Sequence, residues 1–350
     1  MPCGGKNCRR CNYASRSGEG VEKLTVGVIG VGHLGSLHAK MLLEIPTAQL
    51  VGVYDINGGK ARKVAEEFGT RAFGGLDDLL EKADAFTIAT NTVAHWEVAK
   101  VALQRGKHLF IEKPVTETIA EAEELCRLAK GRKLIVQVGH IERFNPAILA
   151  LDKYVIRPMF VESHRLAQFN PRGTDVAVVL DLMIHDIDLI LSFVKSPVAR
   201  VEANGVAVVS DSVDIANARI QFENGCVANV TASRISQRKM RKMRLFQRNE
   251  YISLDFSDGL AEVFRLVEGD EPSAKGTMKL GELGSGKHKR IVVYEQPEVK
   301  EVNALRYEME LFVKAVQHRT EPLVNAEDGK RALEVANAIL DKISQQKMAL

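Results

Sequence analysis

Three glycines at a fixed spacing follow the first apolar run of the chain. The segment GVIGVGHLG places Gly30, Gly32 and Gly35 in a G-x-G-x-x-G pattern, after a β-branched run and before an amphipathic stretch. In that context the first glycine permits a tight turn, the second lets the backbone approach a pyrophosphate, and the third allows close helix–strand contact. The next helix, which starts at His33 and Leu34, offers unpaired N–H groups to phosphate oxygens. The pattern predicts a dinucleotide-binding loop.

An acidic residue lies at the end of the next predicted strand. Asp55 follows Gly35 by twenty residues, where a carboxylate accepts both ribose hydroxyls of NAD and repels the 2′-phosphate of NADP. Lys60 and Arg62 soften that repulsion. We therefore predict NAD as the cofactor and keep NADP as the alternative.

A lysine directly follows a later apolar run. Glu112-Lys113-Pro114 comes after LFI, at the carboxyl end of a predicted parallel strand, where ligands of such sheets bind. A residue before proline is held extended, and the bond to proline is sometimes cis, which would direct Lys113 into the cleft. The alternative is a solvated lysine at a strand end.

Four ionisable residues interrupt the apolar segment VVLDLMIHDIDLIL. Asp181 and His185 are four residues apart, so on a helix they share one face, and Asp188 is available to hold that face. Burying such groups is costly unless they are paired or used in catalysis, so the pattern favours catalysis over a structural histidine. A zinc site needs more ligands than this single histidine supplies, and no metal is predicted.

The elements that must position these residues show two sequence patterns, one in each half of the chain. From residue 24 to about 137, short β-branched runs alternate with amphipathic stretches, which predicts βαβ units on a doubly wound parallel sheet. The expected strands are 24–29, 49–55, 85–90, 107–112 and 134–139, and the expected helices are 33–45, 59–69, 76–83, 94–106 and 117–131.

The second half of the chain changes character. A helix is expected over residues 145–154, and Asn224-Gly225 and Asp258-Gly259 predict hairpin turns in a largely antiparallel, open sheet. Residues 268–290, rich in Gly, Lys and Ser, read as a surface loop. Two helices, 304–318 and 327–345, close the chain.

Length and composition limit the remaining possibilities. With 350 residues, we expect a tail (1–20), a Rossmann domain (21–145) and an α+β domain (146–350) that binds substrate and includes the last helices. A net charge of +3 argues against nucleic-acid or membrane partners. The longest apolar stretch, 176–194, carries ionisable residues and is not expected to span a bilayer.

The cysteines give a weaker signal. Cys3, Cys8 and Cys11 have a C-x4-C-x2-C spacing that occurs in some metal sites, but no fourth ligand follows nearby. Cys126 and Cys226 read as small core residues. Nothing here requires an oxidising compartment, so we expect a cytoplasmic protein.

Taken together and in order, the glycine loop, the Glu-Lys-Pro strand end and the D-x-x-x-H-x-x-D helix resemble the Gfo/Idh/MocA oxidoreductases over about residues 24–345. The resemblance implies that Lys113, Asp181 and His185 are catalytic and that Pro114 follows a cis peptide bond. It also implies that further residues lie near the cofactor, namely Thr90, Asn91, His95 and Glu112.

Within the family, residues 140–147 and 169–188 look most like the members that oxidise the 3-hydroxyl of a UDP-linked N-acetyl sugar, in lipid A or cell-surface polysaccharide synthesis. Glycines frequent near the catalytic helix are replaced by bulkier Val178, Val179 and Met183, which argues against a small polyol. The candidate substrate-binding residues are Arg143, Asn145, Arg165, Arg172, Asp181 and His185. A basic stretch from Arg234 to Arg244 is a further candidate for the diphosphate, or a solvated strand.

In the expected reaction, His185 removes the hydroxyl proton and Lys113 stabilises the alkoxide, with the two roles open to exchange. The alternatives are an inositol or free-sugar dehydrogenase of the same family and a non-catalytic NAD-binding regulator. An open antiparallel sheet needs a cover, so a homodimer or homotetramer is expected.

Overall fold

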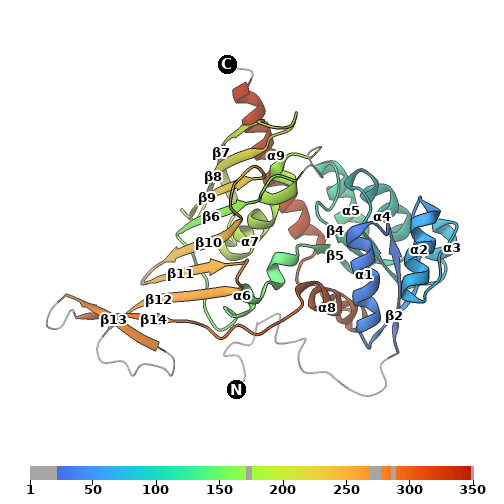
Figure 1. The fold of residues 1–350 in the computed structure, drawn as a ribbon, viewed down its shortest axis with the longest axis horizontal. Coiled ribbons are helices and arrows are strands. Elements are labelled where there is room, and N and C mark those ends of the chain that lie inside the picture. The colour runs from blue at the N-terminus through green and yellow to red at the C-terminus, as the bar shows by residue number, and fades with distance from the viewer. Residues whose placement is uncertain (1–21, 171–175, 269–276, 285–288, 348–350) are drawn as a thin grey trace. The chain divides into compact units, whose positions relative to one another are not determined.

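The structure, a computed structural model, describes residues 22–170, 176–268, 277–284 and 289–347. The chain separates into two units (Figure 1). Unit 1 contains Met1–Ile141 and Asn303–Leu333, and unit 2 contains Glu142–Val302 and Glu334–Leu350. In contrast to the expected division at residue 145, the first unit also takes a segment from late in the chain.

Unit 1 is built on a parallel sheet with the strand order β2-β1-β3-β4-β5. The order reverses between β1 and β3, and ligands of such sheets bind outside the carboxyl ends of the strands at this reversal. The strands are β1 (Leu24–Ile29), β2 (Ala48–Tyr54), β3 (Ala85–Ile88), β4 (His108–Glu112) and β5 (Val136–Gly139). The helices between them are α1 (His33–Glu44), α2 (Gly58–Phe68), α3 (Leu76–Leu80), α4 (His95–Gln104) and α5 (Ile119–Arg132). The predicted Rossmann fold is confirmed.

Local signals in the sequence explain where these helices begin. The side chain of Thr118 accepts a hydrogen bond from the Glu121 backbone N–H, and the Glu121 carboxylate accepts one from the Thr118 N–H, which caps α5 on both sides. Asn57 caps α2 by accepting from the backbone of Gly59. Gly69 ends α2 in the left-handed region at φ +62°.

Helix α8 (Ala304–His318) completes the core of unit 1. Its residues Met309, Phe312 and Val316 are buried in one apolar cluster with β1, β2 and α1. The ring of Phe312 meets Phe110 of β4 edge-on, with 5.9 Å between the ring centroids. The bounds of this helix are as predicted, but the sequence alone assigned it to the second domain, because its apolar face does not reveal which core it covers.

Unit 2 contains a sheet of nine strands in the order β13-β14-β12-β11-β10-β6-β9-β8-β7. Every pairing is antiparallel except β6 with β9. The strands are β6 (Phe160–Leu166), β7 (Val198–Val206), β8 (Ile215–Phe222), β9 (Val227–Ser233), β10 (Met240–Gln247), β11 (Glu250–Asp255), β12 (Leu260–Glu268), β13 (Thr277–Leu283) and β14 (Arg290–Glu295). Both predicted hairpin turns are present, with Gly225 and Gly259 at positive φ.

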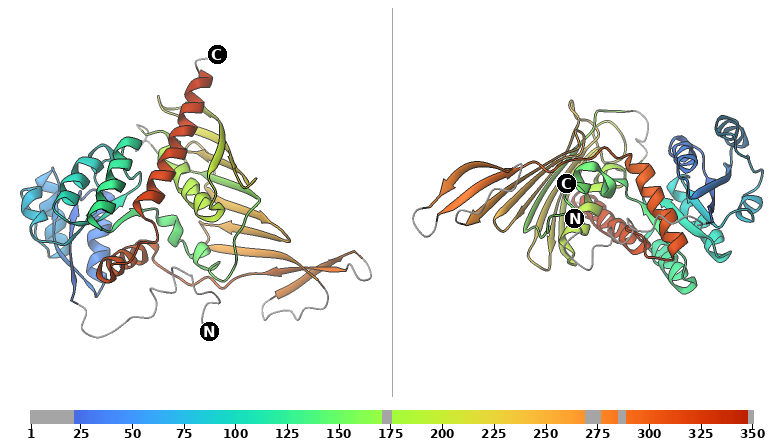
Figure 2. Two further views of the ribbon diagram at one scale, coloured as in Figure 1. Left: turned by 180° about the vertical axis from the view of Figure 1, so that it is seen from behind. Right: turned by 90° about the horizontal axis from the view of Figure 1, so that it is seen from below.

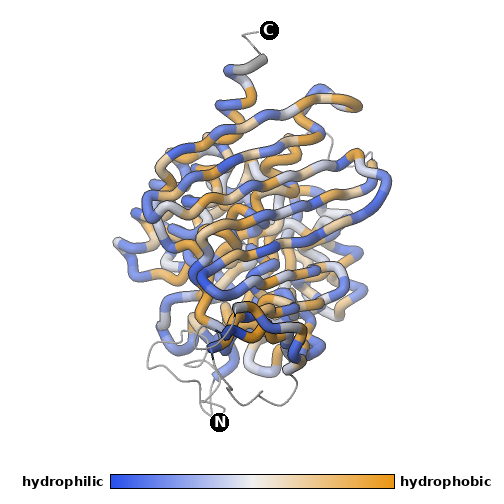
Figure 3. The backbone as a smooth tube through the Cα atoms, turned by 90° about the vertical axis from the view of Figure 1, so that its left-hand side faces the viewer, coloured by the Kyte–Doolittle hydropathy of each residue, from blue (hydrophilic) through white to orange (hydrophobic). Residues whose placement is uncertain are grey.

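One face of this sheet packs against helix α7 (Ile184–Val194), as the views in Figure 2 show. Along β6, Val161, Ser163 and Arg165 are buried on that side, while the residues between them point to the opposite face. Figure 3 looks onto that opposite face, where hydrophilic and hydrophobic residues alternate along the strands.

Two expectations for unit 2 were wrong. Residues 268–290, predicted as a loop, contain β13, which pairs with β14 (Figure 1). The sequence hid this strand because most of its residues are exposed on both faces, so no alternation of apolar and polar residues marks it. The expected helix over 145–154 is only the short α6 (Pro146–Leu149), followed by turns. The last helix, predicted over 327–345, is α9 (Ala326–Lys347).

Candidate active site

The glycine loop after β1 has the geometry that a bound pyrophosphate requires. Gly30 lies at φ +84°, and a Cβ atom on Gly35 would lie 1.8 Å from the Gly30 carbonyl oxygen, so both positions exclude side chains. Gly32 differs, because a Cβ atom there would meet no atom within 4 Å. Gly32 is also the N-cap of α1 and provides no side-chain cap, so the first N–H groups of α1 remain open to a phosphate.

Asp55, directly after β2, holds this loop in place. One carboxylate oxygen accepts a hydrogen bond from the Val31 backbone N–H at 2.9 Å, and the other accepts from the Asn57 N–H at 2.8 Å. The carboxylate is therefore fixed beside the glycine turn. Each oxygen keeps a second lone pair for a ribose hydroxyl, so the expected role of Asp55 stays open.

His95 joins the loops that follow β3 and β4. Its side chain is buried, with Nδ1 2.8 Å from the Pro114 carbonyl oxygen and Nε2 3.1 Å from the Thr90 carbonyl oxygen. Burial lowers the pKa of His95, and the two carbonyl groups oppose that shift. The sequence placed His95 near the cofactor together with Thr90 and Asn91, and the structure places it between the two loops that carry Thr90 and Lys113.

Glu112, the last residue of β4, is buried beside helix α1. Its Oε1 lies 2.9 Å from His38 Nε2, and its Oε2 accepts a hydrogen bond from the Lys113 backbone N–H at 3.3 Å. Burial acts to raise the pKa of Glu112, but the hydrogen bond and charge of His38, together with the charge of Lys113, outweigh it and lower the pKa. No partner for Glu112 was predicted from the sequence. The only available signal was that His38 lies on the apolar face of α1.

Lys113 follows β4 and is partly exposed. The bond between Lys113 and Pro114 is cis, as the family resemblance implied. Because β4 ends at Glu112, Lys113 lies at the carboxyl end of the parallel sheet, as the sequence predicted.

The predicted catalytic helix of unit 2 begins with a wider turn. Residues Val179–Met183, which include Asp181, form a π-helical turn, and α7 starts directly after it. Residues four apart still lie on one face across such a turn, and both Asp181 and His185 are partly exposed. Asp188 does not hold this face, because Arg143 engages both of its carboxylate oxygens at 2.7 and 2.5 Å. Short π-helical turns are frequent at functional sites.

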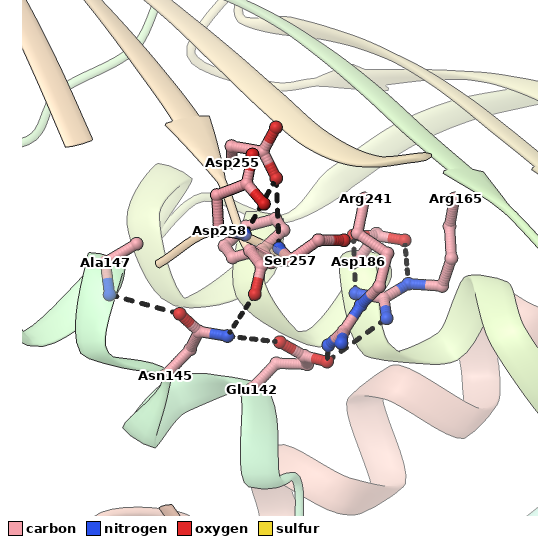
Figure 4. A network of polar contacts seen from close by, with 10 residues as sticks. Glu142, Asn145, Ala147, Arg165, Asp186, Arg241, Asp255, Ser257 and Asp258 are labelled. Atoms are coloured by element: carbon pink, nitrogen blue, oxygen red, sulfur yellow. Dashed lines mark hydrogen bonds and ion pairs between the residues drawn. The ribbon is translucent and has the colours of Figure 1, made fainter. Parts of the chain in front are cut away.

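Buried charges surround the start of α7 (Figure 4). Arg165 of β6 donates to both oxygens of Asp186 at 2.7 and 3.1 Å, and its third nitrogen lies 3.1 Å from Glu142. Arg241 also binds Glu142. The Asn145 amide donates to Glu142 at 3.3 Å, and its oxygen caps α6.

The predicted substrate-binding residues are thus placed differently from one another. Arg143, Asn145 and Arg165 are engaged within unit 2, and Arg165 is only 5% exposed. Arg172 lies outside the described residues. The sequence missed the acidic partners of these residues because their pairing joins segments far apart along the chain.

The basic stretch is mostly paired as well. Arg234 is buried and binds the Val176 carbonyl oxygen, Lys242 lies 3.1 Å from Asp255, and Arg244 lies 3.5 Å from Glu162. Arg238 and Lys239 are exposed.

Comparison with known proteins identifies the family. Residues 24–140 match a model described as an oxidoreductase family with an NAD-binding Rossmann fold, and residues 159–252 match the GFO/IDH/MocA C-terminal domain. A UDP-N-acetylglucosamine 3-dehydrogenase from Acidithiobacillus ferrooxidans is 38% identical over 89% of this chain and 95% of its own length. The chain belongs to the Gfo/Idh/MocA oxidoreductase family.

A solved structure of the same A. ferrooxidans enzyme and a further relative agree with this assignment. The A. ferrooxidans enzyme has a TM-score of 0.83 at 37% identity and covers 92% of this chain and 97% of its own. A scyllo-inositol 2-dehydrogenase (NAD(+)) from Bacillus subtilis is 30% identical over 60% of this chain and 67% of its own length. A levoglucosan dehydrogenase in complex with NADH and levoglucosan, 19% identical with a TM-score of 0.78 over 93% of this chain and 98% of its own, shares the fold.

The residues present fit an NAD cofactor. The open N-terminus of α1, the side-chain-free position at Gly32 and the fixed carboxylate of Asp55 match a pyrophosphate and a ribose. Among the described residues, no group of three or more His, Cys, Asp or Glu side chains is arranged to hold a metal ion. Cys3, Cys8 and Cys11 lie outside the described residues. None of the helices in the described part of the chain combines the length and apolar character needed to cross a bilayer.

Proposed function

We propose that this chain oxidises the 3-hydroxyl of UDP-N-acetylglucosamine to the 3-keto nucleotide sugar, with NAD as the electron acceptor. The observation that carries the proposal is the 38% identity to an enzyme of that name over 95% of its length. The glycine loop supports the NAD part, because it leaves Gly32 and the start of α1 accessible.

Each proposed catalytic residue handles one part of the reaction. The sugar loses a hydride from C3 and a proton from the 3-hydroxyl, and NAD supplies the hydride acceptor when it is bound. His185 removes the proton, and Asp181 on the same helical face orients its imidazole. Lys113 donates a hydrogen bond to the developing alkoxide. Exchange of the roles of His185 and Lys113 is the alternative assignment.

The substrate diphosphate requires cations other than the buried arginines. Arg143 and Arg165 are engaged with carboxylates, so we assign the diphosphate to the exposed Arg238 and Lys239 instead. Replacing Arg238 with Ala is expected to raise KM for the nucleotide sugar and leave NAD binding unchanged. A KM equal to that of the wild type would contradict this assignment.

A substrate screen tests the proposed function. Purified enzyme with NAD is offered UDP-N-acetylglucosamine, other UDP-sugars, myo-inositol and glucose, and reduced nicotinamide is followed by its absorbance. A transaminase that removes the keto product increases the yield if the equilibrium favours the substrate. We expect turnover with UDP-N-acetylglucosamine, increased by the transaminase.

Two outcomes would favour other functions. Turnover with inositol but no UDP-sugar supports the polyol dehydrogenase alternative, for which the B. subtilis relative is the precedent. Tight NAD binding with no turnover on any sugar or polyol supports a regulator.

We also propose that the chain forms a homodimer or homotetramer through the sheet face opposite α7. Phe160, Phe246, Tyr251, Phe264 and Tyr294 form a row across β6, β10, β11, β12 and β14, with neighbouring ring centroids 5.0 to 5.9 Å apart. Phe160 alternates with buried Val161 on β6, so the row lies on the face away from α7. Such an aromatic row is typical of a covered surface.

Sedimentation measurements test this assembly. The wild type is expected to sediment as a dimer or tetramer, and Phe246→Glu is expected to shift it toward the monomer. A monomeric wild type at micromolar concentration would rule the assembly out.

The cysteines that the structure describes, Cys126 and Cys226, are buried and outside any disulfide bond, which supports a cytoplasmic location. The proposed keto product fits lipid A or cell-surface polysaccharide synthesis.

A further inference from the structure

Two aspartates of α7 are each held by the two parallel nitrogens of one arginine. Arg165 binds Asp186 at 2.7 and 3.1 Å, and Arg143 binds Asp188 at 2.7 and 2.5 Å. Both carboxylates are 1% exposed. Arg165 comes from β6, and Arg143 comes from the short 3-10 turn Ile141–Phe144. Two separate parts of unit 2 therefore grip one helix through its side chains.

The two contacts lie on either side of His185. An α-helix turns by about 100° per residue. Asp186 is therefore displaced by about 100° from His185 in one direction around the axis, and Asp188 by about 60° in the other. A rotation of α7 in either direction stretches one of the two contacts. The His185 side chain leaves the helix between them.

The charges of this cluster are balanced and further braced. Glu142, Asp186 and Asp188 face the three guanidinium groups of Arg143, Arg165 and Arg241. Glu142 lies between Arg165 and Arg241, and the Asn145 amide donates to it (Figure 4). Arg165 is thus fixed on two sides, by Asp186 and by Glu142.

Such a cluster fixes the orientation of the groups that it joins more than it stabilises the fold. Buried ion pairs often stabilise a fold no better than apolar residues of the same volume. A guanidinium group bound through two nitrogens, in contrast, fixes the direction and distance of its carboxylate. The helix held in this way also follows a π-helical turn, whose hydrogen-bond pattern differs from that of a regular α-helix.

We propose that Arg143 and Arg165 are positioning residues that fix the rotation of α7 and thereby the direction of the His185 side chain. This inference rests on the proposed function, in which His185 is the base. It assigns to both arginines a role other than the substrate contact expected from the sequence. Neither arginine touches the substrate; each acts through its aspartate.

Lysine substitutions test the proposal, because lysine keeps the charge and loses the planar two-nitrogen contact. Arg165→Lys and Arg143→Lys are each expected to lower kcat about 10- to 100-fold. KM and the Kd for NAD are expected to change less than about twofold, since neither arginine contacts a ligand. The matched control is Arg127→Lys on α5, where an exposed arginine binds both oxygens of Glu124 at 2.7 and 2.5 Å. The control is expected to retain wild-type kcat.

The double variant separates positioning from two independent structural roles. If both contacts are needed to fix one rotation, the first substitution already releases the helix, and the double variant loses little more kcat than the worse single variant. If the two arginines have independent roles, the losses in kcat of the two single variants multiply in the double variant. Fully multiplicative losses, or a kcat loss that matches only the loss of folded protein by circular dichroism, would overturn the proposal.

A measurement without substrate or NAD keeps the inference separate from the proposed function. In enzyme labelled with 15N-histidine, His185→Gln identifies the ring cross-peaks of His185. These cross-peaks are expected to move in both single variants and to stay in place in Arg127→Lys. Unmoved cross-peaks in both variants would overturn the positioning role even if the wild type oxidises the UDP-sugar. Moved cross-peaks in an enzyme that oxidises no UDP-sugar would leave the positioning role standing and refute the proposed function.

Discussion

Nε2 of His38 lies 2.9 Å from Oε1 of Glu112, and both side chains are buried in unit 1. His38 belongs to α1, the helix that the glycine loop begins, and Glu112 immediately precedes Lys113. One hydrogen bond therefore joins the element expected to hold the cofactor phosphates to the strand that carries the proposed catalytic lysine. The pair thus connects the helix that follows the glycine loop with the end of β4, the two parts of unit 1 that are expected to contact the cofactor.

Removal of His38 is expected to cost more stability than neutralisation of Glu112. His38→Leu leaves a buried carboxylate without this partner, which costs about 3–5 kcal/mol. Glu112→Gln keeps an oxygen for the imidazole and removes the charge, with an expected loss of about 1–2 kcal/mol. Urea unfolding of the two variants measures the difference. Equal stabilities would show that Glu112 does not depend on His38 for its charge.

Alanine is expected to lower NAD affinity at one position of the glycine loop and to lower stability at another. Gly32→Ala places its methyl group in open space, so folding is unaffected, while NAD affinity falls at least about tenfold because the methyl group obstructs the pyrophosphate. Gly35→Ala meets the Gly30 carbonyl oxygen and destabilises unit 1. Calorimetric titration with NAD and thermal unfolding separate the two effects. Unchanged NAD affinity in Gly32→Ala would place the phosphates elsewhere.

Replacing Lys113 with Met is expected to abolish turnover and leave NAD binding nearly intact. Methionine matches the lysine side chain out to Cε and lacks the ammonium group, so the alkoxide loses its hydrogen-bond donor. The expected loss in kcat is about 100-fold or more. Steady-state kinetics and NAD titration on the same preparation provide the test. Normal turnover would refute the assignment of Lys113.

His108 predicts a pH dependence of stability in unit 1. Its Nδ1 accepts a hydrogen bond from the Ile135 backbone, and Nε2 lies 2.9 Å from Arg319. Burial, followed by the charge of Arg319, lowers the pKa of His108 to about 4. The unfolded chain, with a pKa near 6.5, therefore binds a proton that the folded chain refuses. Stability is unaffected above about pH 6.5 and falls by about 3 kcal/mol as the pH decreases to about 4.

The measurement is urea unfolding between pH 4 and 7.5. His108→Gln is expected to reduce the slope between pH 4 and 6.5, and His164→Gln in unit 2 serves as the control. An unchanged slope in His108→Gln would assign the acid sensitivity to other groups.

The sequence predicted the elements of unit 1 because each has a local cause. The glycine loop, the capping box at Thr118 and the buried strands all appear within a few residues of where they act. The position of α8 was not predictable in this way. Its apolar face marks a buried helix but not the sheet that buries it, since Phe312 and Phe110 are far apart in the sequence.

In the candidate site, too, residues with a local signal could be predicted and contacts between distant segments could not. Lys113 and His185 are proposed from residue type, spacing and resemblance. The partners of Arg165 and Arg143 were not, because a lone arginine in a strand or turn looks the same whether it faces a ligand or a buried aspartate. Ion pairing between distant segments leaves no periodic signal in one sequence.

The membership of α8 in unit 1 has a consequence for the folding of the protein during its synthesis. A ribosome releases the five parallel strands first, but Met309, Phe312 and Val316, which seal the side of that core, emerge only after all of β6 to β14. The apolar surface of the nascent first unit that α8 later covers therefore stays exposed while the second unit is synthesised. Nascent chains stalled before residue 304 should be cut rapidly by protease within residues 22–141, and the released full-length chain should resist.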